Sequence, residues 1–211
     1  MIRSKDITIA GSFDRCLKLE GTHVPTITSK EGEAQGLMRA AGLMMVSCRT
    51  APKSGGIDDI ETVLLTGEEK DKIAEQMEKM GEERKLEGFK RDADNVNRSE
   101  ALLVVGINGR KSFGVPCGAC GHSTCQEFDA TAPVSGLDFE GPTCIFKALD
   151  LGIALGSAVK MATELNVDNR IMYRAGTAAK SLGYLSHSSV VMGIPISACG
   201  KSIYFDRKWP K

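Results

Sequence analysis

The sequence predicts an α+β fold in which helices and a sheet pack as a sandwich. Apolar residues recur at helical spacing in several segments, and other runs are short, apolar and rich in β-branched residues, which is typical of strands. These segments are mixed without the strict alternation of strand and helix that indicates a parallel sheet. At 211 residues the chain is long enough to bury one sizeable core.

The first predicted element is a helix that begins at Ser29, where serine and nearby glutamates are typical of a helix start, and ends within residues 48–52. Residues 1–28 are interpreted as an N-terminal extension with a short strand around residues 7–9. We expect residues 29–211 to form a single domain.

The next part of the chain contains two predicted strands. The loop at 53–56 leads into IETVLLTG, residues 60–67, whose alternation and β-branched residues favour a strand. Residues 68–80 predict an amphipathic helix, and the continuous apolar run at 101–107 predicts a buried strand. Between them, residues 81–100 are highly charged and are interpreted as a surface loop or a frayed helix end.

The C-terminal part begins with two predicted helices, at residues 144–165 and 169–182. Two strand-like runs, VVMGIPIS and SIYFDR, close the chain. Gly152 and Gly156 lie four residues apart in the first helix, and this spacing predicts the close approach of another helix or backbone.

Charge and apolar content exclude several classes of function. The 27 basic and 27 acidic residues cancel, so nothing favours nucleic acid as a partner. Neither a secretion signal nor an apolar run long enough to span a membrane is evident, and we expect a cytoplasmic protein. In a reducing compartment, clustered cysteines are typical of metal ligands or redox groups, and an odd total of seven argues against a full set of disulfides.

The chemistry is concentrated in the stretch VPCGACGHSTC. Cys117, Cys120 and Cys125 have the spacing C-x2-C-x4-C, and Cys144 follows in GPTC. A 4Fe-4S cluster needs four thiolates, and the glycines between the cysteines permit the sharp turns that let a loop present three of them. Cys144 is expected in the first turn of a helix, where the helix dipole favours the thiolate. We therefore predict a cluster-binding segment at residues 113–144.

Other metal readings of this segment stay open. Four cysteines could hold structural zinc, but zinc commonly uses paired C-x2-C units and only one is present, so the spacing favours a cluster. His122 could ligate zinc or donate to a cluster sulfur, although a solvated loop histidine is the favoured interpretation. Lone cysteines are usually small residues of the core, and we interpret Cys16, Cys48 and Cys199 in this way.

Several cationic residues could bind an anion. Arg170 and Arg174 are four residues apart and could clamp a phosphate or carboxylate from one helical face. Arg49 and Lys53 flank the Ala51-Pro52 turn, where a flavin phosphate could bind. Ordinary solvated charge is the favoured alternative at all of these positions.

CGACGHSTCQEF together with GPTC resembles the small 4Fe-4S domain of the corrinoid iron–sulfur protein subunit of acetyl-CoA synthase complexes and of electron-transport complex subunits. Most of the chain is more similar to a family of uncharacterised prokaryotic proteins that contain a ferredoxin domain. The matching stretches include CRTAPKSGGIDDIETVLLTGEE, GPTCIFKALDLGIALGSAVKMA, DNRIMYRAGTAAKSLGY and VMGIPISACGKSIYFDR. This resemblance implies a cluster carried by Cys117, Cys120, Cys125 and Cys144, and it implies no established reaction.

The order of elements also resembles that of flavin-dependent nitroreductases, in which a helix leads to an A-P-S-x-x-N loop and a late G-x-P strand precedes a basic tail. Residues 51–54 and 193–195 fit this outline, but the paired arginines that grip the flavin phosphate have no counterpart, and residues 55–60 replace N-Q-P-W. The resemblance implies a nitroreductase-like sandwich that carries the cysteine-rich loop as an insertion, pairs as a homodimer and could bind FMN. The residues considered for FMN or another anion are Arg49, Lys53, Ser54, Arg170 and Arg174.

Three functions are consistent with these patterns. The favoured one is an iron–sulfur redox protein that exchanges single electrons with a partner protein, a small-molecule acceptor or a second cofactor. The second is a nitroreductase-like flavoenzyme, in which a cluster feeds FMN. The third is a structural zinc module with four cysteine ligands. Whether the protein is an enzyme stays open.

Overall fold

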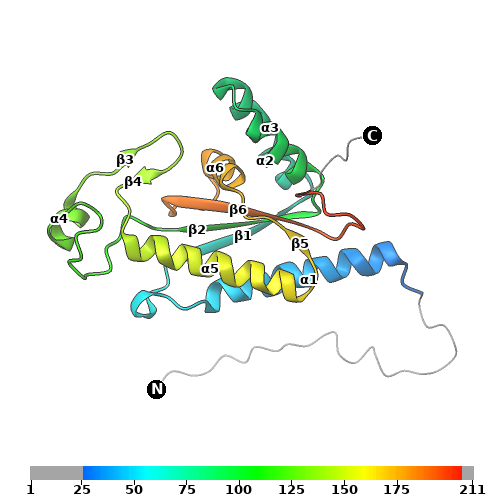
Figure 1. Cartoon of the computed structure of the whole chain (residues 1–211), viewed down its shortest axis with the longest axis horizontal. Helices are drawn as coiled ribbons and strands as arrows, with labels where there is room; N and C mark the ends of the chain where they lie inside the picture. Colours follow the sequence, from blue (N-terminus) through cyan, green and yellow to red (C-terminus); the bar gives the residue numbers. More distant parts are fainter. Residues whose placement is uncertain (1–25, 206–211) are drawn as a thin grey trace, which may run out of the picture.

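The computed structural model describes residues 26–205, so the predicted extension and its strand near residues 7–9 lie almost wholly outside it (Figure 1). Its main sheet is antiparallel, with the strand order β1-β2-β6-β5. The strands are β1 (Ile60–Thr66), β2 (Ala101–Ile107), β5 (Asp168–Asn169) and β6 (Val190–Ser197). The helices that cover it are α1 (Ser29–Thr50), α2 (Gly67–Arg84), α3 (Glu87–Asn97), α5 (Ile145–Glu164) and α6 (Tyr173–Ser181).

Helices cover both faces of the sheet, which confirms the predicted α+β sandwich. Figure 1 shows α1 and α5 side by side on one face and α2, α3 and α6 on the other. The α1–α5 layer buries Met44, Ala154 and Ala158 against alternate residues of β2, and the second layer buries Ile73, Phe89 and their neighbours against the other face. Because β2 is covered on both sides, all seven of its residues are buried.

Most predicted elements are confirmed, including the helix from Ser29, the strands at 60–67 and 101–107, and the strand VVMGIPIS. Thr28 starts α1 with a capping box, in which its hydroxyl accepts from the Glu31 N–H and the Glu31 carboxylate accepts from the Thr28 N–H. No helix within residues 26–205 is long and apolar enough to cross a membrane.

The interpretation of residues 81–100 as a loop or frayed helix end is wrong, because α3 occupies most of this segment. Phe89, Ala93 and Val96 recur at helical spacing and are almost completely buried against α2 and the sheet. The surrounding charges masked this narrow apolar stripe. The helical spacing of three buried residues was the signal that could have revealed it.

Three further predictions are corrected at the C-terminal end. The predicted strand SIYFDR is not formed over residues 202–205, where the chain bends, and its remainder lies outside the described residues. The helix expected from residue 169 begins at Tyr173, because Asp168 and Asn169 pair with β6 as strand β5. Among residues 26–205, nothing approaches Gly152 or Gly156 closely, since a Cβ added at either would meet no atom of this part of the chain within 4 Å.

Candidate metal centre

The segment between β2 and α5 projects from one end of the sandwich as a lobe, at the left of Figure 1. It contains the short helix α4 (Cys125–Ala130) and the hairpin of β3 (Val134–Ser135) and β4 (Glu140–Gly141). One hollow in this lobe is lined by all four cysteines of the predicted site, together with Val115, Pro116, His122, Phe128 and Ile145. Cysteines separated by up to 27 positions in the sequence therefore line one place, as the spacing predicts.

The four thiols differ in access to solvent. Cys117 is exposed, Cys120 and Cys125 are half-buried, and Cys144 is buried at the base. Among residues 26–205, no group of three or more His, Cys, Asp or Glu side chains is drawn together closely enough to hold a single metal ion. The thiols lie around the hollow.

The turns between the first cysteines depend on glycine. Gly118 and Gly121 have φ of 73° and 86°, a left-handed conformation in which a side chain is strained. The Gly121 N–H donates to the Gly118 carbonyl at 3.0 Å, and the Cys117 N–H donates to the Val115 carbonyl at 2.7 Å. These tight turns present Cys117 and Cys120 to the same hollow.

Cys125 is oriented by a second capping box. Its preceding residue, Thr124, accepts from the Glu127 N–H at 3.2 Å, and the Glu127 carboxylate accepts from the N–H groups of Thr124 and Ser123. Phe128, buried one turn later, lies edge-on to His122 with 5.8 Å between ring centroids. His122 is half-buried and lines the same hollow as the cysteines.

Cys144 is the N-cap of α5, one residue before the helix itself. Its backbone N–H donates to the Gly109 carbonyl at 2.9 Å, and its own carbonyl accepts from the Ala148 N–H at 3.1 Å. The 20-residue helix α5 directs its positive end toward the hollow, which favours an anionic ligand there. The prediction that Cys144 stands at a helix start is confirmed.

Arg110 stabilises the lobe through contacts with two of its segments, a role that the sequence did not predict. Its guanidinium donates to the carbonyls of Pro142, at 3.1 Å, and Thr131, and it stacks 5.6 Å from the Phe128 ring centroid. Ser112 adds two hydrogen bonds to the Asp129 carboxylate. These contacts join the beginning and the end of the cysteine segment, and no local motif in the sequence indicates them.

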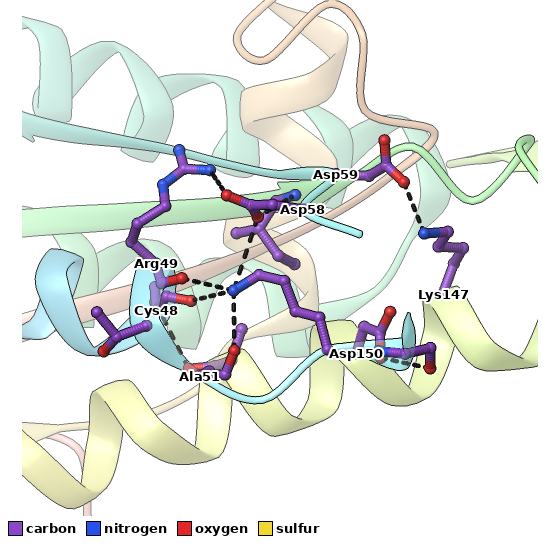
Figure 2. A network of polar contacts seen from close by, with 12 residues as sticks. Cys48, Arg49, Ala51, Asp58, Asp59, Lys147 and Asp150 are labelled. Atoms are coloured by element: carbon purple, nitrogen blue, oxygen red, sulfur yellow. Dashed lines mark hydrogen bonds and ion pairs between the residues drawn. The ribbon is translucent and has the colours of Figure 1, made fainter. Parts of the chain in front are cut away.

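Three of the predicted anion-binding residues already have partners beneath the lobe (Figure 2). Lys53 donates to the carbonyls of Arg49, at 2.6 Å, and Ala51, at 2.9 Å, which closes the C-terminal end of α1. Arg49 forms an ion pair with Asp58. The N–H and hydroxyl of Ser54 both donate to the Asp150 carboxylate, at 2.9 and 2.8 Å.

The other two predicted anion-binding residues lie on the opposite face of the sheet. Arg174 on α6 pairs with the buried Asp92 of α3 at 2.7 Å, and Arg170 lies 3.9 Å from the same carboxylate. Because α1 and α6 cover different faces, the five residues considered for FMN do not gather at one site. Each one also has a partner within the chain. As a set, they do not fit a bound flavin.

The cysteines outside the proposed site differ in their burial. Cys48 is completely buried and its thiol donates to the Ala154 carbonyl at 3.5 Å, so the core interpretation is confirmed for it. Burial raises the pKa of Cys48 to about 11, despite the opposing charges of Lys53 and Arg49. Cys199 is exposed and lies 3.9 Å from the Glu100 carboxylate, so the core interpretation is wrong for it. Cys16 lies outside the described residues.

Comparisons with known proteins agree with the resemblance to the ferredoxin-domain family and with the nitroreductase-like order of elements. Residues 140–207 match a family model described as "Uncharacterized protein containing a ferredoxin domain". An uncharacterized protein of Archaeoglobus fulgidus is 50% identical over 181 residues, which cover 86% of this chain and 97% of that protein.

Among solved structures, the nitroreductase CinD from Lactococcus lactis in complex with nicotinic acid has a TM-score of 0.55 at 9% identity. The match covers 82% of this chain and 84% of that one. The complex of CinD with 4-nitrophenol gives a TM-score of 0.51 at 12% identity, with the same coverage. At such low identity the likeness shows the fold, which is nitroreductase-like.

Proposed function

The chain belongs to a family of uncharacterised proteins that contain a ferredoxin domain, and we propose that it is an iron–sulfur redox protein with one 4Fe-4S cluster. The ligands would be Cys117, Cys120, Cys125 and Cys144. The observation that carries the proposal is the single hollow that all four cysteines line. A bound cluster would supply storage of one electron at a time.

The cysteine spacing supports a cluster over the structural zinc alternative. A zinc ion would draw four sulfurs to about 2.3 Å from one point, whereas a cluster would occupy volume between its thiolates. The chain contains a single C-x2-C unit, whereas structural zinc sites commonly contain two, and this favours a cluster.

The chain's own residues would hold and shield the cluster unevenly. Cys144 is buried at the base and fixed to α5 and Gly109, while Cys117 is exposed at the rim beside Val115 and Pro116. We propose that a redox partner protein or a small acceptor approaches this exposed rim, in the reducing cytoplasm. Electron exchange is favoured there because the least covered ligand gives the shortest route to a partner.

Anaerobic purification with iron, sulfide and zinc analysis tests the proposal. We expect a brown protein with about four irons and four sulfides per chain. Cys144→Ser should lower the iron content and change the visible spectrum, whereas Cys199→Ser, which alters an exposed cysteine away from the hollow, should change neither. A colourless protein with one zinc per chain would contradict the proposal and favour the structural module.

An FMN-dependent, nitroreductase-like oxidoreductase is the second candidate, and the shared fold is the observation in its favour. The partners of Arg49, Lys53, Ser54, Arg170 and Arg174 oppose it, because these residues lie on two faces of the sheet and none is left without a contact. Fluorescence of flavin released by denaturation decides the question. Stoichiometric FMN in protein reconstituted with flavin would favour this candidate over simple electron transfer.

We also propose that the protein pairs as a homodimer. Helices α1 and α5 lie side by side, and both turn large apolar side chains outward, among them Leu43, Val46, Leu149 and Ile153. Large apolar side chains exposed on two neighbouring helices are typical of an interaction site. A second copy is the partner that the nitroreductase-like fold suggests.

A further inference from the structure

A completely buried lysine lies three residues after one of the proposed cluster ligands and is not itself a ligand. Lys147 has no exposed surface and lies in the first turn of α5, three residues after Cys144. Its Nζ is 2.6 Å from Oδ2 of Asp59, the residue that precedes β1. Lys147 Nζ has no hydrogen-bond partner beyond this ion pair among residues 26–205. Lysine is almost never fully buried unless paired, so the ion pair with Asp59 accounts for the burial of Lys147.

Lys147 lies within one helical turn of Cys144. Residues three apart share a helix face, so the two residues lie on the same side of the first turn of α5. Figure 2 shows Lys147 rising from α5 to meet Asp59. The neighbouring residue on α5, Phe146, packs against Phe113 of the cysteine segment, with 4.8 Å between ring centroids.

Asp59 connects this pair to the chain that leads from β2 to the cysteine segment. Its Oδ1 is 3.3 Å from Nζ of Lys111, and its backbone carbonyl accepts from the Asn108 N–H at 3.4 Å. Burial alone would raise the pKa of Asp59, but the hydrogen bonds and charges of Lys147 and Lys111 outweigh it and lower the pKa. Two lysines therefore share the Asp59 carboxylate, and these three groups taken alone carry a net charge of about +1.

The charge of this group opposes the charge of the proposed cluster. A cluster held by four thiolates is anionic, and it becomes more negative by one charge when it accepts an electron. A buried cation near the cluster would stabilise the reduced cluster more than the oxidised cluster, and salt would screen this interaction only weakly. Lys111 is more than half exposed, so its contribution is screened more strongly.

We infer that Lys147, held in place by Asp59, raises the reduction potential of the cluster and so selects the range of electron donors that can reduce it. The inference rests on the proposed cluster. In this step the cluster gains one electron from an external one-electron donor, and no bond or proton of Lys147 or Asp59 changes. Lys147 acts through its charge and its position and is not itself a ligand.

A redox titration followed by visible absorption and electron paramagnetic resonance tests the inference. We expect Lys147→Met to make reduction about tenfold less favourable, which is a shift of about 59 mV to more negative potential for one electron. Asp59→Asn removes a negative charge and should shift the potential in the positive direction. Lys160→Gln is the matched control, because Lys160 lies at the far, exposed end of α5 and should leave the potential unchanged.

Iron and sulfide content separates the possible failures. A wild-type protein without iron and sulfide overturns the proposed function itself. Normal cluster content with an unchanged potential in Lys147→Met overturns only the inference. The inference is also overturned if Asp59→Asn shifts the potential in the negative direction by as much as Lys147→Met does, because loss of packing rather than of charge would then be responsible. If Lys147→Met does not fold, Lys111→Gln is the variant that tests the inference. It should shift the reduction potential in the negative direction by a smaller amount, and the shift should shrink with added salt. An unchanged potential at low salt overturns the inference.

Discussion

Gly109 accepts a hydrogen bond at 2.9 Å from the backbone N–H of Cys144, which ties the start of α5 to the chain that leaves β2. The Gly109 N–H in turn donates to the Ser189 hydroxyl at 2.8 Å. The position has no room for a side chain, because an added Cβ would lie 2.6 Å from Thr143 Cγ2 and 2.9 Å from Ser189 Oγ. The innermost proposed ligand is therefore positioned by a residue outside the cysteine motif.

Gly109→Ala should displace Thr143 and, with it, the adjacent Cys144. Overpacking of a tight site typically costs about 1–3 kcal/mol, and we expect a loss of thermal stability together with reduced iron content. Gly36→Ala on α1 is the control, since an added Cβ there meets nothing within 4 Å and alanine favours a helix. Equal melting temperatures and iron contents for Gly109→Ala and the wild type would show that Thr143 and Ser189 adjust without moving Cys144.

Cys48 should make the stability of the protein sensitive to alkaline pH. Burial raises its pKa from 9.0 to about 11, so the folded state keeps the thiol neutral. The resulting contribution to stability is fully present below the pKa of the unfolded chain and is lost as pH rises from about 9 to about 11. A rise in the pKa of Cys48 from 9.0 to about 11 corresponds to about 2–3 kcal/mol of folding stability lost at high pH.

Urea unfolding of the wild type and of Cys48→Ala across this pH range measures the effect. Cys48→Ala should be less stable at pH 8, because a buried thiol contact is lost, but its stability should fall less steeply toward pH 11. Native iodoacetamide labelling gives a second readout, in which the exposed Cys199 reacts and Cys48 does not. Parallel slopes for the two proteins, or rapid labelling of Cys48 in the folded wild type, would contradict this prediction.

The sequence predicts the parts of this structure that depend on local pattern. The spacing of Cys117, Cys120 and Cys125 and the helix start after Cys144 identify the lining of one hollow, because turns and helix caps are set by nearby residues. The helical spacing around Ser29 and the apolar run of β2 identify the layers in the same way.

What the sequence does not predict depends on contacts between distant segments. The pair of Lys147 and Asp59 joins residues 88 positions apart, and nothing near either of them in the chain indicates that both are covered. Two of the predicted anion-binding residues also have partners far away in the sequence: Ser54 contacts Asp150, and Arg174 contacts Asp92. A charged residue in a sequence has the same appearance whether it is free or already paired, and only the fold distinguishes the two.

The outward faces of α1 and α5 provide a test of the proposed homodimer. Leu149 and Ile153 are about half exposed and lie one turn apart on α5. Replacing both with glutamate would force two negative charges on each chain into an apolar interface, where burial without a partner is costly. We expect the double variant Leu149→Glu/Ile153→Glu to be a folded monomer under conditions in which the wild type is a dimer, as measured by light scattering after gel filtration.

The matched control is Leu137→Glu, because Leu137 is 80% exposed at the tip of the β3–β4 hairpin, away from both helices. It adds a negative charge to an exposed apolar position and should leave the dimer intact. Circular dichroism must show the same helical content for all three proteins, so that dissociation is not confused with unfolding. A wild type that is monomeric at every concentration, or a double variant that still dimerises, would rule out pairing through this face and leave the apolar surface available to a redox partner.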